Sequence, residues 1–104
     1  MDRSDRVLVA DRENDRVQLF DRAGHYLEEW GDFYHPMDIY EDHAGRIYVS
    51  DQIPRLSLLS PSGQLIGRCR PCYNTPHGVW GAPDGAIFIA ETNPNQVIKL
   101  APEP

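Results

Sequence analysis

The chain has 104 residues, of which 40% are hydrophobic and 25% are charged, and this length and composition fit one globular domain. No run approaches the roughly 20 apolar residues of a membrane-spanning helix. The first six residues, Met-Asp-Arg-Ser-Asp-Arg, lack the apolar core of a signal peptide, so we expect a cytoplasmic protein with no membrane partner. The net charge of −6 argues against a nucleic-acid partner, because nonspecific binding needs a positive field.

A six-residue phrase recurs at a spacing of 40 residues. It reads Arg-Val-Leu-Val-Ala-Asp at 6–11, Arg-Ile-Tyr-Val-Ser-Asp at 46–51 and Ala-Ile-Phe-Ile-Ala-Glu at 86–91. A fixed period of this size indicates a repeat architecture. The recurring motif divides a single repeat domain, 1–104, into segments 1–35, 36–75 and 76–104.

Short β-rich runs separated by turn residues follow one another along the whole chain. They lie at 7–10, 17–20, 26–30, 36–40, 47–49, 56–59, 65–66, 78–80, 87–89 and 97–100. Nine Pro and eight Gly interrupt them, and no 11-residue window has a helical period. The pattern predicts an all-β chain of ten strands. Four short antiparallel strands in about 40 residues are typical of a β-propeller blade.

The strand count also predicts an incomplete ring. The first segment supplies three strands, the second four and the third three, because the chain opens within one repeat and stops before the end of another. Ten strands cannot close a ring of four-stranded blades, and an open arc exposes apolar blade faces. We therefore expect a homo-oligomer or completion by another chain.

Each second strand of the repeat ends in a carboxylate, at Asp11, Asp51 and Glu91. In a propeller, the three carboxylates could form an acidic ring around one mouth of the central channel. The favoured interpretation is structural: each carboxylate accepts backbone N–H bonds in the following loop. Arg16 and Arg55 begin the third strands, so we expect exposed Asp11–Arg16 and Asp51–Arg55 ion pairs across that loop.

His77 and Trp80 begin the third inner strand, near the channel where a propeller binds a small-molecule or peptide ligand. A neutral imidazole can coordinate a metal, but a catalytic zinc site needs about three protein ligands. Local hydrogen bonding of His77 is an equally good interpretation, and packing between blades is favoured for Trp80. We expect no cofactor unless oligomerisation gathers several copies of His77 around a zinc ion.

A Cys-x-x-Cys pair at Cys69 and Cys72 has the spacing of a redox motif. Such motifs work in a βαβ context, and no helix is expected behind this pair. Free thiols or an incidental disulfide are therefore the expected state.

The segment 9–20 reads Val-Ala-Asp-Arg-Glu-Asn-Asp-Arg-Val-Gln-Leu-Phe and resembles the NHL repeat. The resemblance covers essentially the whole chain and implies the blades of a six-bladed propeller. More narrowly, Ala-Asp-Arg-Glu-Asn at 10–14 together with Pro-His-Gly at 76–78 is similar to the peptidyl-α-hydroxyglycine α-amidating lyases. That branch implies a zinc held by three inner-strand histidines, with a tyrosine and arginines nearby.

Carried over to this chain, His77 matches one zinc histidine and Arg16 an active-site arginine. The other two histidines have no match, and Gln-Ile-Pro at 52–54 stands where the tyrosine is implied. We therefore expect a noncatalytic NHL-type segment that self-associates and serves as a binding or interaction module, with Arg16, His77 and Trp80 as candidate ligand contacts. The alternative is a metal-dependent lyase or hydrolase completed by oligomerisation. RNA binding is disfavoured by the charge and by the single lysine, Lys99.

Overall fold

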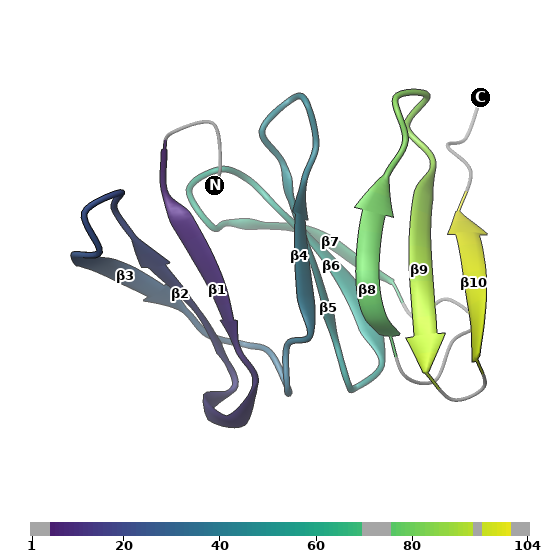
Figure 1. Cartoon of the computed structure of the whole chain (residues 1–104), viewed down its shortest axis with the longest axis horizontal. Helices are drawn as coiled ribbons and strands as arrows, with labels where there is room; N and C mark the ends of the chain where they lie inside the picture. Colours follow the sequence, from purple (N-terminus) through teal and green to yellow (C-terminus); the bar gives the residue numbers. More distant parts are fainter. Residues whose placement is uncertain (1–4, 70–75, 93–94, 101–104) are drawn as a thin grey trace.

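The computed structural model describes residues 5–69, 76–92 and 95–100 (Figure 1). Ten strands in this part of the chain form three antiparallel sheets that stand side by side in chain order. The prediction of an all-β chain is confirmed, since the described residues contain no α-helix. Consequently, none of them belongs to a helix long and apolar enough to cross a membrane.

Each sheet is a meander of consecutive strands. The first sheet contains β1 (Val7–Asp11), β2 (Arg16–Phe20) and β3 (Tyr26–Trp30), with a short 3-10 helix, η1 (Arg12–Asn14), after β1. The second contains β4 (Asp38–Glu41), β5 (Ile47–Asp51), β6 (Arg55–Leu59) and β7 (Leu65–Cys69). The third contains β8 (Pro76–Gly81), β9 (Ile87–Thr92) and β10 (Asn95–Leu100).

Aspartates set the hairpin turns. Asp42 Oδ1 accepts hydrogen bonds from the backbone N–H groups of Ala44 and Arg46, both at 2.9 Å, at the turn between β4 and β5. A short carboxylate can mimic a backbone turn in this way. Gly45 follows with φ of 86°, a left-handed conformation that costs glycine little. The Asp-x-x-Gly sequence at 21–24 forms the same turn, since Asp21 Oδ1 accepts the N–H groups of Ala23 and His25 and Gly24 has φ of 87°.

The register of the strands repeats with the sequence. Asp11 pairs with Arg16 at the end of the β1–β2 ladder, and Asp51 pairs with Arg55 at the end of the β5–β6 ladder. Glu91 and Gln96 occupy the corresponding pair in the third sheet. Position by position, 7–11 therefore corresponds to 47–51 and 87–91, and 16–20 corresponds to 55–59 and 96–100.

Alternation along these strands sends neighbouring side chains to opposite faces of each sheet. One face of the first sheet packs against the second sheet through a buried cluster that we call the first joint, made of Val17, Leu19, Trp30, Phe33, Ile47, Val49 and Leu59. The other face of the second sheet packs against the third through the second joint, made of Leu56, Val79, Ile87 and Ile89 with Tyr40, Tyr48, Ile98 and Leu100 at its margin. The two joints bury corresponding positions, so the three sheets follow one packing plan.

Candidate functional site

The predicted carboxylates lie at one end of the molecule, because β1, β5 and β9 all end on the same side (bottom of Figure 1). Asp11 Oδ2 lies 2.8 Å from Arg16 Nε. Asp51 Oδ2 lies 2.8 Å from Arg55 Nε. The two ion pairs expected across the loops are therefore present. In the third sheet, the Gln96 amide donates to the Glu91 carboxylate in place of a guanidinium.

The environments of these pairs differ from the expectation that both would be exposed. The Asp51 side chain is 0% exposed and that of Arg55 is 14% exposed, whereas Asp11 and Arg16 are 22% and 33% exposed. The backbone N–H of Tyr34 donates to Asp51 Oδ2 at 3.4 Å, so the buried carboxylate also contacts the segment before β4. The Asp51–Arg55 pair is thus largely buried. Its burial depends on the residues that pack around it, which the Asp and Arg spacing alone does not reveal.

The expected loop-fixing role also differs between the two aspartates. Asp51 Oδ1 accepts the backbone N–H of Ile53 at 3.2 Å, as the sequence predicts. Asp11 makes no capping bond to the backbone of η1; the Asn14 side-chain amide reaches its carboxylate at 3.1 Å instead. A side-chain clamp therefore replaces the backbone clamp in the first loop.

Arg16, a candidate ligand residue, is held between two carboxylates. Its Nη1 lies 3.2 Å from Glu29 Oε2 in addition to the Nε contact with Asp11. The hydrogen bond from Arg16 lowers the pKa of the Asp11 carboxyl below its ordinary value of 3.8. These contacts suit a residue that ties β1, β2 and β3 together.

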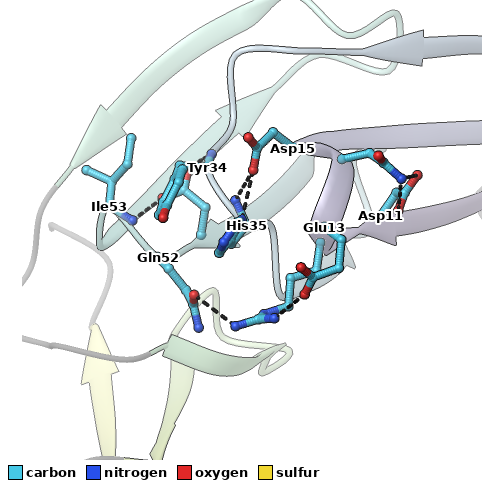
Figure 2. A network of polar contacts seen from close by, with 10 residues as sticks. Asp11, Glu13, Asp15, Tyr34, His35, Gln52 and Ile53 are labelled. Carbon is cyan, nitrogen blue, oxygen red and sulfur yellow. Dashed lines mark hydrogen bonds and ion pairs between the residues drawn. The ribbon is translucent and has the colours of Figure 1, made fainter.

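A second polar network, which nothing in the sequence spacing predicted, links the first two sheets (Figure 2). The backbone N–H and Nδ1 of His35 both lie 2.9 Å from Asp15 Oδ1. The Gln52 N–H donates to the Tyr34 carbonyl at 2.9 Å, and Arg12 Nη2 reaches Gln52 Oε1 at 3.3 Å. The contact with His35 lowers the pKa of Asp15, chiefly through the backbone hydrogen bond. The network connects the loop after β1 with the segment before β4 and the loop after β5.

Arginines reinforce the same joint from the outer strands. Arg68 Nη1 lies 2.7 Å from Asp32 Oδ2, and the guanidinium groups of Arg68 and Arg55 both donate to the Asp32 carbonyl at 2.6 Å. Arg68 also stands over the Phe33 ring at 5.9 Å. The planar fork of arginine suits such multiple contacts. Asp32 and Arg68 are 36 residues apart, so only folding brings them together.

The third sheet presents an apolar face on the side away from the second sheet. We call it the open face; it is formed by Trp80, Phe88, Ala90, Val97 and Lys99. Trp80 is 58% exposed and Val97 is 69% exposed. The Trp80 and Phe88 rings lie 5.8 Å apart, and Lys99 Nζ is 5.9 Å from the centre of the Phe88 ring. A hollow of about 250 Å³ is lined by residues of this face together with Val79 and with Asp38 of β4; the other lining residues are Gly78, Trp80, Phe88, Ala90 and Val97. Within the chain Trp80 therefore contacts Phe88 but is not enclosed between sheets.

The predicted site residues do not converge. Arg16 lies in the first sheet and Trp80 in the third, with the second sheet between them (Figure 1). His77 lies in β8 at a register shift between Pro76 and Gly78, and its side chain falls outside the described part of the chain. Cys72 also lies outside the described residues. Among the side chains that are described, no group of three or more His, Cys, Asp or Glu is placed to hold a metal ion.

A scan of known protein families finds no match to this chain, and a search of curated proteins finds none either. The resemblance to NHL repeats therefore depends on the residues of the chain alone.

Proposed function

We propose that the chain is a noncatalytic NHL-type β-propeller segment, with its three sheets as successive blades, that self-associates and serves as an interaction module. The observation that carries the proposal is the open face. It exposes Val97 at a position that is buried in the other two sheets, and Trp80 at a position that is partly buried in the second sheet.

The comparison between corresponding residues gives the proposal its weight. Val97 is 69% exposed, whereas the residues at the same place in the first and second sheets, Val17 and Leu56, are 0% and 6% exposed. Trp80 is 58% exposed, whereas Tyr40 at the corresponding place is largely covered by the third sheet. A contiguous exposed apolar patch of this kind is typical of a protein interaction site.

The polar groups support a structural role over catalysis. Asp11 and Asp51 bind arginines of their own sheets, and His35 contacts Asp15 across the first joint. These side chains fix loops and join sheets, so their charges are matched by partners within the chain.

Light scattering coupled to size-exclusion chromatography tests the self-association. We expect a mass above the 11.9 kDa of one chain that falls towards that value on dilution. A mass of one chain at every micromolar concentration would overturn the proposal.

Elemental analysis of protein purified without an affinity tag tests the noncatalytic part. We expect no stoichiometric zinc. Stoichiometric zinc in the wild type that is lost in His77→Ala would favour the lyase or hydrolase alternative.

A further inference from the structure

We infer that the open face of one copy binds the outer face of the first sheet of a second copy, so that self-association is head-to-tail. The inference rests on the proposed self-association and names the two surfaces that produce it. The outer face of the first sheet means the side that points away from the second sheet, formed by Val7, Val9, Gln18 and Phe20.

The open face repeats the surface that the second sheet offers to the third. In the second joint, Tyr40, Tyr48 and Leu56 of the second sheet pack against Ile87 and Ile89. By register, the corresponding residues of the third sheet are Trp80, Phe88 and Val97. The third sheet thus presents an aromatic pair and a β-branched side chain where the second sheet has two tyrosines and a leucine.

The outer face of the first sheet repeats the complementary surface. Val7 and Val9 correspond to Ile47 and Val49 in the first joint and to Ile87 and Ile89 in the second. Val49 and Ile89 are 0% exposed, whereas Val9 is 40% exposed. The chain therefore carries both halves of the contact that it makes twice internally, one at each end of its row of sheets.

The hollow on the open face supplies a place for the incoming side chains. Its walls include Trp80, Phe88 and Val97. The second-sheet residues at the same positions pack with Ile89 in the second joint. In the proposed contact, Val9 of the second copy takes the place that Ile89 takes within the chain. The described first sheet contributes β1 and β2 but no strand corresponding to β4, so we expect this contact to be weaker than the internal joints and reversible on dilution.

Charge favours the head-to-tail arrangement over pairing of two open faces. Pairing of two open faces would bring two copies of Lys99 together, and like charges across an interface are unfavourable. Asp11 and Glu29 flank Arg16 on the outer side of the first sheet and leave one net negative charge there. The net charge of this group is therefore opposite in sign to that of Lys99 on the open face. A contact between two different faces is heterologous, so copies add in one direction until a ring closes or the row stays open.

Complementary surface variants test the inference. Val97→Asp places a charge on the open face, and Val9→Asp places one on the outer face of the first sheet. Both sites are exposed in a single chain, so each variant is expected to fold. We expect each variant alone to be monomeric in light scattering, because each has lost one of the two faces. A mixture is expected to form a dimer of one Val97→Asp chain and one Val9→Asp chain, because each supplies one intact face.

Native mass spectrometry with one variant ¹⁵N-labelled identifies the mixed pair. Ile66→Asp is the matched control, since Ile66 is 55% exposed on β7 and belongs to neither face; this variant is expected to assemble like the wild type. Far-UV circular dichroism verifies folding, and Val97→Asn with Val9→Asn replaces the pair if a charge unfolds either chain.

The outcomes separate the inference from the proposed function. A Val9→Asp chain that still assembles alone, while Val97→Asp does not, would indicate pairing of two open faces and overturn the head-to-tail contact only. Dissociation of the Ile66→Asp control would likewise place the interface elsewhere. A wild type that stays monomeric at every concentration would overturn self-association itself. Binding of a different protein to the open face, with no contact between copies of this chain, would also overturn it.

Discussion

The two joints of this molecule bury the same positions but surround them differently. The first joint combines an apolar cluster with the Asp32–Arg68 pair and the Asp15–His35 contact. The second has an apolar cluster, the Tyr40 ring over Gly81 and one carboxylate, Asp38, which accepts the Val79 N–H at 2.8 Å. Apolar packing is thus common to both joints and follows from the repeat, whereas the polar contacts differ from one joint to the other.

The difference teaches which parts of a repeat are interchangeable. In the second strand of each repeat (β1, β5 and β9), the pleat turns alternate side chains towards the adjacent sheet. Any apolar residue of suitable size at these positions preserves the packing. Polar contacts depend on loops of particular length and on charges far apart in the chain. We therefore expect changes in the apolar clusters to have the largest effects and changes in the ion pairs of the first joint to have smaller ones.

The largest effect is expected for Ile89→Ala in the second joint. Ile89 is 0% exposed, and removal of its side-chain atoms leaves a cavity, so the free energy of unfolding is expected to fall by about 3–4 kcal/mol. Val9→Ala at the corresponding exposed position is the control and is expected to change it by less than about 0.5 kcal/mol in the monomer. Urea unfolding at a concentration where the chain is monomeric measures both. Equal losses of unfolding free energy would contradict the difference in burial between Ile89 and Val9.

Asp51→Asn is expected to have the next largest effect. The substitution removes the negative charge beside Arg55, whose side chain is only 14% exposed, and loss of one partner of a buried pair costs about 3 kcal/mol. Asp11→Asn breaks the corresponding pair of the first sheet, which water reaches, and is expected to cost clearly less. Chemical unfolding of both variants gives the comparison, and a larger loss for Asp11→Asn would contradict the difference in burial.

Gly81→Ala tests the second joint alone. An added Cβ would lie 2.3 Å from a ring atom of Tyr40, so the two sheets must separate or the ring must move. Overpacking of this kind is expected to cost about 2 kcal/mol. Gly67→Ala is the control, because nothing lies within 4 Å of its added Cβ. Similar melting temperatures for the two variants would show that the ring gives way easily.

Ser50→Ala is expected to stabilise the chain. The Ser50 Oγ is buried and has no hydrogen-bond partner among the described residues, and alanine stands at the corresponding positions 10 and 90. Removal of an unsatisfied buried hydroxyl is expected to raise the free energy of unfolding by about 1 kcal/mol. A loss of stability in thermal unfolding would reveal a partner for this hydroxyl.

The smallest effect is expected from acid. Arg68 lowers the pKa of Asp32, and His35 lowers that of Asp15, each from an ordinary value of 3.8. As the pH falls below that value, the unfolded chain takes up protons before the folded chain does, so stability is complete above it and decreases as the pH approaches the lowered values. Thermal unfolding between neutral and acidic pH measures the slope. Asp32→Asn should flatten it, and an unchanged slope would remove Asp32 from the explanation.

Sequence reasoning succeeded where the interactions are local or repeated. The three copies of the repeat's second strand (β1, β5 and β9) follow from a constant spacing, and the Asp11–Arg16 pair follows from residues five positions apart. It did not predict the Asp15–His35 and Asp32–Arg68 contacts, which join residues 20 and 36 positions apart. No periodicity marks such pairs, since they arise once, at a single joint.

The chain's own order of residues was sufficient for the strands, the turns between them and the ion pairs across the loops. These features follow from alternation, turn chemistry and a period of 40 residues, all of which act over short distances along the chain. The burial of Asp51, the separation of Arg16 from Trp80 and the exposure of Val97 emerged only when the sheets were packed. Exposure depends on what lies across an interface, and identical positions in a repeat acquire different surroundings according to whether another sheet stands beside them.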